Sequence, residues 1–310
     1  MDQFSNHPLY RKHTIDSVMS TLWEFYKKNF LVLFLSSFVV CLCVQFISAK
    51  INFGEITSYT DPMQLLEKYK SMMVPFLEVA AISLVFNVIL QYYVMYNPLE
   101  EHPNIFAAAY KSLKYLPAYI VILVLFTFMA AAALIVGLIL FIVGMFFALF
   151  WLAMVFMFIL PILMAEGNNI GHTISRTFSL SHRGFWSNMG WVAILILIIM
   201  VVSFVVSGLI MIPFSGSFFK IISHPEEAAS AMNFMTNPLF VALSAILSAL
   251  ITPVMPIFSA ILYFNGRSRE TELATPVPNN EPDRVRVEDL YAKPYSDDHP
   301  DNPENKHTES

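Results

Sequence analysis

The longest feature of the hydrophobic pattern is an uncharged run from Leu116 to Ala165, which holds no Asp, Glu, Lys, Arg or His. Crossing about 30 Å of hydrocarbon takes about 20 helical residues. The run is too long for one crossing, and it lacks the polar face that a soluble surface helix carries. We therefore expect it to cross a membrane twice, with a tight turn between Gly137 and Gly144.

Four further apolar segments have the length of a membrane-spanning helix. Together with the uncharged run they predict six transmembrane helices, at about residues 30–49, 75–96, 117–137, 144–165, 191–212 and 238–264. The pattern thus predicts an all-α integral membrane protein, because helices are the spanning structure that long apolar runs form. We expect a membrane domain over residues 14–270, a flexible N-terminus over residues 1–13 and a tail over residues 271–310.

Amphipathic segments and repeated landmarks organise these spans into units. At 100° per residue, the segments 15–28 and 170–185 each separate an apolar face from a basic, polar one, as interfacial helices do. Thr14 precedes Asn29 by fifteen residues, and Thr173 precedes Asn188 by fifteen residues. We interpret the chain as three hairpin units, each opened by an amphipathic interfacial helix.

Prolines are expected to frame the segments on the outer side. Pro75 follows Pro62 by thirteen residues, and Pro238 follows Pro225 by thirteen residues. We predict that the second proline of each pair opens a returning span. Asp61 is expected to cap a short outer helix over residues 62–73, because aspartate is a preferred N-cap and proline suits the first helical position.

The distribution of Lys and Arg predicts the orientation, because cytoplasmic loops carry the excess of these residues. With the N-terminus inside, ten fall inside and four outside. The inner ones are Arg11, Lys12, Lys27, Lys28, Lys111, Lys114, Arg176, Arg183, Arg267 and Arg269, and the outer ones are Lys50, Lys68, Lys70 and Lys220. Both termini are therefore expected in the cytoplasm, and we expect no cleavable signal peptide before the first span.

The net charge of −5 comes from the tail. Residues 271–310 hold ten acidic and four basic residues and six prolines, with few large apolar side chains. Such a segment buries too little surface to offset its ordering entropy. We expect a disordered, acidic, cytoplasmic tail, in which residues 284–291 could dock a partner protein.

The sequence offers no recognisable catalytic constellation. It has no glycine-rich phosphate loop, no metal-ligand spacing of Cys and His, and no G-x-S-x-G motif. Cys41 and Cys43 point about 200° apart on a helix and are expected to be packing residues. The histidines fall in the expected flexible ends, in a loop or at the interfaces. We therefore predict no catalytic residue, no metal site, no cofactor and no nucleic-acid partner.

A polar stripe interrupts the second span. Ser83, Asn87 and Gln91 follow one another at i+4 spacing and share one helix face. Hydrogen bonds between helices are the simpler use of such side chains, and lining a polar conduit is the alternative. Pro253 and Pro256 lie inside the last span and predict a kink there.

Basic residues close to the inner interface form the second candidate site. Arg176 and Arg183 are seven residues apart and share a helix face, while Arg267 and Arg269 end the last span. We hypothesise that these four arginines converge and hold an anionic lipid headgroup. Ordinary positive-inside topology is the alternative.

Several short motifs also carry a family resemblance. They are residues 161–167 (PILMAEG), 174–180 (ISRTFSL), 184–186 (GFW) and 262–270 (LYFNGRSRE). This region resembles the membrane domain attached to some bacterial glycerophosphoryl diester phosphodiesterases. The resemblance implies a bacterial cytoplasmic membrane and a link to lipids or phosphodiesters. Hydrolysis is not implied, because the catalytic barrel would need a further soluble domain of about 250 residues, which we do not expect here.

The favoured hypothesis is therefore a non-enzymatic membrane protein that binds membrane lipids or a partner protein. The alternative is a transporter or channel for a small or lipid-related solute, and a membrane-embedded lipid enzyme is a third class. A polar cavity at mid-membrane depth would favour transport, whereas a dry core would favour the first hypothesis.

Overall fold

The computed structural model describes residues 4–51, 61–100, 104–223 and 232–274, and these residues form helices without a strand. The chain divides into a unit that ends at Thr271 and a second unit from Glu272 onward, and the account below concerns the first. Its helices are α1 (Ile15–Lys28), α2 (Phe30–Ser48), α3 (Pro62–Tyr96), α4 (Ile105–Ser112), α5 (Leu116–Ile139), α6 (Phe141–Ala165), α7 (Ile170–His182), α8 (Phe185–Met211), α9 (Ser215–Ser223), α11 (Pro238–Ile251) and α12 (Val254–Ala274).

Six helical segments in the described residues are long and apolar enough to span a membrane. They are Phe30–Ser48, Pro62–Leu99, Ile105–Ile139, Phe141–Ala165, Phe185–Ser217 and Pro238–Thr271. The prediction of an all-helical chain with six such segments is confirmed at this level. The fold therefore has the features of a multi-pass helical membrane protein.

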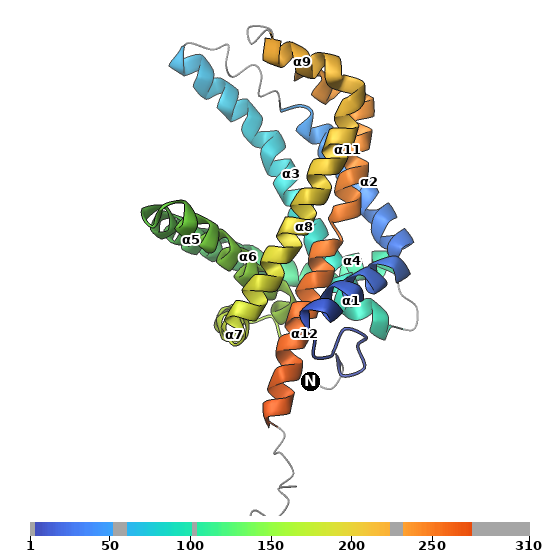
Figure 1. The fold of residues 1–310 in the computed structure, drawn as a ribbon, viewed down its shortest axis with the longest axis vertical. Coiled ribbons are helices and arrows are strands. Elements are labelled where there is room, and N and C mark those ends of the chain that lie inside the picture. The colour runs from blue at the N-terminus through green and yellow to red at the C-terminus, as the bar shows by residue number, and fades with distance from the viewer. Residues whose placement is uncertain (1–3, 52–60, 101–103, 224–231, 275–310) are drawn as a thin grey trace, which may run out of the picture. The chain divides into compact units, whose positions relative to one another are not determined.

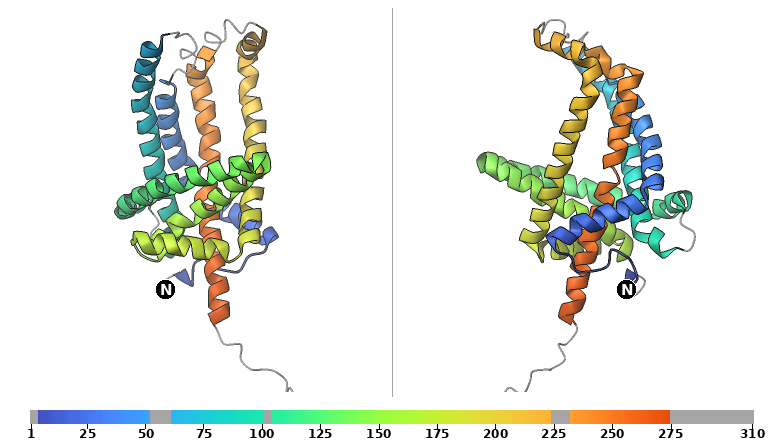
Figure 2. Two further views of the ribbon diagram at one scale, coloured as in Figure 1. Left: turned by 90° about the vertical axis from the view of Figure 1, so that its left-hand side faces the viewer. Right: turned by 45° about the vertical axis from the view of Figure 1, so that its right-hand side comes forward.

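The long helices take two directions (Figures 1 and 2). The helices α2, α3, α8 and α11 run roughly alongside one another, whereas α5 and α6 form a hairpin that lies across them in every view. The shorter helices α1, α4 and α7 lie together at one end of the α2, α3, α8 and α11 group. The amphipathic segments 15–28 and 170–185, which are expected at the inner interface, thus lie at the same end.

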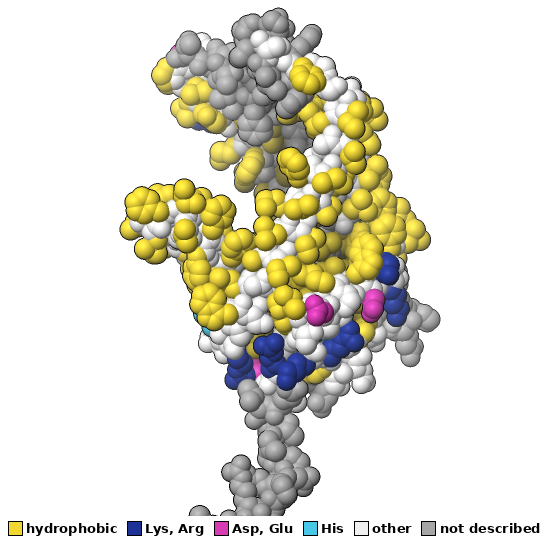
Figure 3. Space-filling view, in the orientation of Figure 1, with side chains coloured by type: hydrophobic (Ala, Val, Ile, Leu, Met, Phe, Trp, Pro, Cys, Tyr) yellow, Lys and Arg dark blue, Asp and Glu magenta, His cyan; other side chains and the backbone are white. Residues whose placement is uncertain are grey.

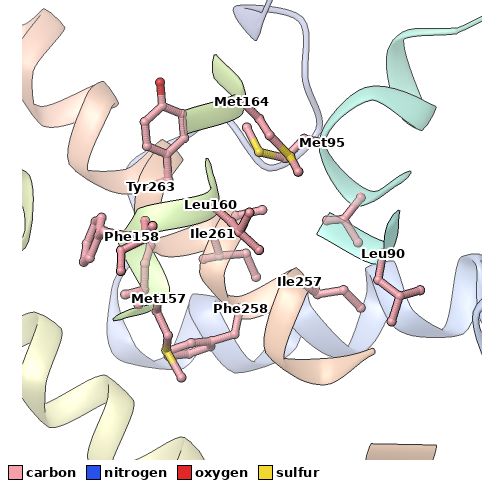
Figure 4. Packing of buried hydrophobic residues seen from close by; sticks show 14 of the residues in the cluster. Leu90, Met95, Met157, Phe158, Leu160, Met164, Ile257, Phe258, Ile261 and Tyr263 are labelled. Atoms are coloured by element: carbon pink, nitrogen blue, oxygen red, sulfur yellow. The ribbon is translucent and has the colours of Figure 1, made fainter. Parts of the chain in front are cut away.

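The core lies where α3, α6 and α12 meet (Figure 4). Leu90 of α3, Phe158 of α6 and Phe258 of α12 are fully buried in it. The second half of α6 is buried almost continuously from Met154 to Met164, because neighbouring helices cover several sides of it. This packing fixes the ends of α6 and α12, which carry the charged residues described below.

The turn between α5 and α6 lies where the glycines predict it. The α5 helix ends at Ile139 and α6 begins at Phe141, whose φ of 60° reverses the chain. A Cβ on Gly137 would lie 2.9 Å from the carbonyl oxygen of Gly144, and one on Gly144 would lie 2.7 Å from that of Gly137. Glycine is needed here because the two backbones touch.

The N-terminal segment differs from the expected flexible one. Residues 4–13 are packed against the end of α3 and the middle of α12, with Phe4, His7, Leu9 and His13 buried. The rings of Phe4 and His7 lie 5.6 Å and 4.6 Å from the ring of Phe264. Apolar side chains at several of these positions supply enough burial to order the segment.

The prolines act in different ways. Pro238 begins α11 behind the capping side chain of Asn237, as predicted for a returning span. Pro75 does not begin a helix: α3 runs through it from Pro62 to Tyr96, so the prediction of a separate outer helix over residues 62–73 is wrong. The cap itself is confirmed, since Asp61 accepts a hydrogen bond from the Met63 amide.

The predicted kink in the last span is present as a break. The α11 helix ends at Ile251 and α12 begins at Val254, on either side of Thr252 and Pro253. Residues 271–274 continue α12, so the expected disordered tail does not begin at residue 271. The rest of that tail, residues 275–310, and Pro225 of the second proline pair lie outside the described residues.

Candidate functional site

A charged cluster joins the end of α6 to α7 and α12. Arg176 of α7 is its centre, and its Nε donates to Oε2 of Glu166 at 2.9 Å. Its Nη1 donates to Oε1 of Glu270 at 2.8 Å, and its Nη2 donates to Oε2 of the same carboxylate. The guanidinium of Arg176 therefore binds two carboxylates, one that follows α6 and one on α12.

Two more arginines reach the same carboxylates. The Nη1 of Arg267 lies 2.9 Å from Oε2 of Glu270 and 3.7 Å from Oε1 of Glu166. The Nη1 of Arg183 lies 2.9 Å from Oε1 of Glu270. The hydroxyl of Tyr263 donates to Oε1 of Glu166 at 3.2 Å. Three of the four predicted arginines therefore converge.

The cluster keeps an excess of positive charge, because three arginines face two glutamates. Hydrogen bonds to Glu270 raise the pKa of Arg176 above its usual value, and those to Glu166 add to this, against the opposing effect of burial. The Arg176 side chain is only 18% exposed, whereas the Arg183 side chain is 45% exposed. Arg176 therefore serves the fold, and Arg183 is the member that can reach a ligand.

The fourth predicted arginine lies elsewhere. The guanidinium of Arg269 lies 5.8 Å from the centre of the Trp191 ring and next to Gly184, where a Cβ would meet its Nη1 at 3.0 Å. Its Nε is buried without a hydrogen-bond partner. Arg269 therefore does not contact Glu166 or Glu270. It lies beside Gly184, the residue that follows Arg183.

An apolar groove runs along the α5–α6 hairpin. A cavity of about 670 Å³ extends from the α5–α6 turn at Gly137 and Gly144 to Met129 and Trp151, and a second of about 170 Å³ continues from Met129 to Thr177 of α7. Their linings are hydrophobic, apart from the Thr177 hydroxyl, which is buried without a partner.

Aromatic side chains stand at the α7 end of the groove. Trp151 donates its Nε1 proton to Nε2 of His182 at 3.1 Å, and the His182 ring stacks on Phe185 at 5.6 Å. Trp186 contacts Phe185 and is 74% exposed. Arg183 lies within this aromatic stretch of the sequence. Trp residues with a polar handle are typical of the headgroup level of a membrane.

The predicted polar stripe divides into two parts. Gln91 is buried, and its Nε2 donates to the carbonyl oxygen of Pro256 at 3.3 Å, which is the interhelical use. Ser83 and Asn87 instead line a polar cavity of about 250 Å³ between α2, α3 and α11. Cys41, which the sequence analysis assigns to packing, lines the same cavity, whereas Cys43 is exposed elsewhere on α2.

His7 and His13 are buried, although the sequence predicts that they lie in a flexible end. His7 is 3% exposed, and its Nδ1 accepts from the Leu9 amide at 3.1 Å while its Nε2 meets the Val94 carbonyl at 3.2 Å. Burial lowers the pKa of His7 to about 4 and also lowers that of His13. The apolar residues at positions 4 and 9 are the signal that could have revealed the packing. Among the described residues, no group of three or more His, Cys, Asp or Glu side chains has the arrangement of a metal site.

The chain matches no protein-family model, no curated protein and no solved structure. The resemblance of residues 161–270 to the phosphodiesterase membrane domain therefore stays a prediction.

Proposed function

We propose that this chain is a non-enzymatic, multi-pass protein of a bacterial cytoplasmic membrane that binds anionic lipid at its basic end. The observation that carries the proposal is the surplus of arginine at the α7 end of the apolar groove. Arg183 is half exposed there, and Arg269 keeps a buried Nε without a hydrogen-bond partner.

A headgroup phosphate would satisfy both arginines. A guanidinium carries five N–H donors, and the structure engages Nη1 of Arg183 with Glu270. Phosphate oxygens suit the planar fork of Arg, which binds them with two parallel hydrogen bonds. The Trp191 ring holds the Arg269 guanidinium by a cation–π contact at 5.8 Å, and the buried Nε of Arg269 has no hydrogen-bond partner in the described residues.

The groove along α5 and α6 would take an acyl chain. Its two cavities share Met129 and together follow the hairpin toward α7, where the aromatic residues begin. The groove passes Trp151, whose indole donates to His182, the residue before Arg183. An apolar groove beside a basic residue matches a lipid, which has an acyl chain and a charged headgroup.

The basic end is proposed to face the cytoplasm, with both termini on that side. Lys and Arg gather at the end of the molecule that holds α1, α7 and α12, beneath a wide hydrophobic band (Figure 3). The anionic inner leaflet attracts such charges. A cytoplasm-active reporter fused after Ser310 should be active, and one inserted at Ser58 should be silent. The reverse pattern would overturn this orientation.

The lipid site is tested by removing two charges. Arg183→Gln combined with Arg269→Gln removes the two proposed ligands, and Lys27→Gln combined with Lys28→Gln removes the same charge from α1. Each charge near an anionic surface contributes about 1 kcal/mol in either pair. The hydrogen bonds of the arginines to a phosphate add about 1.5 kcal/mol or more, so the arginine pair should weaken retention of phosphatidylglycerol about tenfold more than the lysine pair. Native mass spectrometry of protein from mixed phosphatidylglycerol–phosphatidylcholine vesicles measures this. Equal losses in both double variants would show that the arginines serve topology alone.

The tail is proposed as a docking segment for a partner protein. Its acidic, proline-rich sequence supports this proposal, and its residues 275–310 lie outside the described part of the chain. Deletion of residues 275–310 should leave lipid retention unchanged, since none of the proposed lipid ligands lies there. A loss of lipid would assign the tail a part in that site.

A further inference from the structure

Three helices direct uncharged polar side chains into one cavity. Cys41 and Gln45 come from α2, Ser83 and Asn87 from α3, and Ser248 from α11, with Thr252 directly after the end of α11. Each pair is four residues apart and therefore shares a helix face. The cavity measures about 250 Å³, more than ten times the roughly 10–15 Å³ of probe volume that one water needs.

The cavity lies deep in the apolar part of the chain. Ser83 and Asn87 fall midway along the predicted second span, residues 75–96, and Thr252 falls midway along the sixth, residues 238–264. A polar group at this depth finds no water in surrounding lipid, so each unsatisfied group costs several kcal/mol. Such groups need partners inside the protein or inside the cavity.

The protein itself satisfies these groups only in part. The Nε2 of Gln45 lies 3.5 Å from Oγ of Ser248, at the weak limit of hydrogen bonding. Thr252 is better satisfied, because its Oγ1 donates to the Ser248 carbonyl at 2.7 Å and lies 3.7 Å from Sγ of Cys41. In the part of the chain that the structure describes, the side chains of Ser83 and Asn87 have no hydrogen bond to another residue. Asn87 alone offers two donors and one acceptor to the cavity.

The helix break adds acceptors at the same level. Pro253 and Pro256 have no N–H, so the carbonyls of Ala249 and Thr252 lose their helical partners. Thr252 lines the cavity, and the neighbouring Pro256 carbonyl already accepts from Gln91. The break thus supplies backbone oxygen to a site that already holds amides and hydroxyls.

We propose that this cavity binds a small uncharged solute rich in hydroxyl or amide groups. The lining has no Asp, Glu, Lys, Arg or His, so a bare ion entering it would meet no countercharge and would lose its hydration. The mixture of donors and acceptors matches a molecule that also carries both. This site is independent of the lipid site, because it uses none of the same residues, and it supports the alternative function of solute transport.

The two cysteines of the chain provide the test. Cys41 lines the cavity and Cys43 does not, so Cys43→Ser leaves a probe inside the cavity and Cys41→Ser leaves one outside it. The probe reagent is 2-hydroxyethyl methanethiosulfonate, itself small, uncharged and hydroxylated. A thiolate displaces methanesulfinate from it and forms a mixed disulfide, and thiolates form only where the thiol is solvated. Cys43 is exposed on a span and would face lipid, where its thiol stays protonated. Cys41 is buried but lines the cavity, so water in the cavity should make it react about tenfold faster than Cys43 in nanodiscs.

Protection identifies the bound class. Glycerol or acetamide should slow the labelling of Cys41 in a saturable way and leave Cys43 unaffected, whereas potassium chloride of equal osmolality should slow neither. Equal rates for the two cysteines would show a dry cavity and overturn the proposal. Protection that is absent for both solutes, or as strong with potassium chloride, would also overturn it.

A matched pair of variants removes one cavity hydroxyl and one outside it. Ser83→Ala removes a hydroxyl that lines the cavity, and Ser36→Ala removes one that bonds the Val32 carbonyl of its own helix. In the Cys43→Ser background, Ser83→Ala should weaken protection by glycerol several-fold, and Ser36→Ala should not change it. We expect both variants to fold like the parent protein. Measuring the midpoint of thermal unfolding for each variant checks this. Unchanged protection in a folded Ser83→Ala protein would contradict the role of α3.

Discussion

Arg176 and Glu270, which are ninety-four residues apart in sequence, form a bidentate ion pair. The Nη1 of Arg176 donates to Oε1 of Glu270 at 2.8 Å, and its Nη2 donates to Oε2. The pair fastens the interfacial helix α7 to the end of the last long helix, and Glu166 extends it to the end of α6. Three elements are therefore held in register by one guanidinium.

Replacing Glu270 tests this fastening. Glu270→Gln leaves three arginines with Glu166 alone, and removing one partner of a buried pair costs about 3–5 kcal/mol. We expect a loss near the lower limit, because the Glu270 side chain is 16% exposed. Denaturant unfolding of the protein in micelles measures it. The exposed Glu24 serves as control, and Glu24→Gln should change stability by less than about 0.5 kcal/mol. Equal losses of stability in Glu270→Gln and Glu24→Gln would contradict a structural role for Glu270.

The α5–α6 turn should reject even a methyl group. A Cβ on Gly144 would press against the Gly137 carbonyl at 2.7 Å, so Gly144→Ala should destabilise the protein by about 1–3 kcal/mol through overpacking. Gly208 of α8 has open space around the same position, and Gly208→Ala should be neutral or stabilise by about 0.5–1 kcal/mol. Thermal unfolding in detergent compares the two. A stable Gly144→Ala protein would mean that the helices separate easily there.

A tyrosine from α1 contacts the backbone next to the break in the last long helix. The buried Tyr26 hydroxyl donates to the Leu250 carbonyl at 3.1 Å, where the helix is about to end. Tyr26→Phe should leave that carbonyl unpaired and cost about 1–3 kcal/mol. Tyr110, which is highly exposed, gives the control, and Tyr110→Phe should have no effect on unfolding. If the two substitutions behave alike, water or lipid replaces the hydroxyl.

The N-terminal segment should loosen in acid. The His7 ring fits its site as the neutral tautomer, since Nδ1 accepts from Leu9 and Nε2 donates to Val94. Its folded pKa of about 4 lies below the ordinary 6.5, so the unfolded chain binds the proton first as pH falls. Stability is full above pH 6.5 and is lost toward pH 4, by on the order of 3 kcal/mol. The lowered pKa of His13 acts in the same direction.

Stability measured at several pH values between 7 and 4 checks this prediction. His7→Gln keeps hydrogen-bonding capacity without a titrating group and should flatten the profile, while its stability at pH 7 should change less than the wild type loses in acid. A profile of unchanged slope in His7→Gln would assign the acid sensitivity to other groups.

The sequence predicts the six long helices well because apolar length alone decides them. It does not predict the direction of α5 and α6, since an uncharged hairpin has no polar face to orient it. The continuity of α3 through Pro75 is also hidden, because a proline inside an apolar helix is tolerated when neighbours satisfy the freed carbonyl.

The candidate sites show the same division. Helical spacing places Arg176 with Arg183 and Ser83 with Asn87, because these relations are local. Spacing cannot show that Glu270 neutralises the arginines, or that Gln45 and Ser248 from two other helices face the Asn87 cavity. Those relations arise from packing between distant segments. Matching i+4 polar pairs on three separate spans are the signal that could have pointed to the cavity.

The packing of residues 4–13 has a consequence for how the protein is made. His13 leaves the ribosome 252 residues before its partner Asn265, so the segment 4–13 must wait for α12 to be synthesised before it can pack. Closing so long a loop is slow compared with forming the local hairpins. The segment 4–13 would thus pack late in folding, and only after the sixth long helical segment has formed.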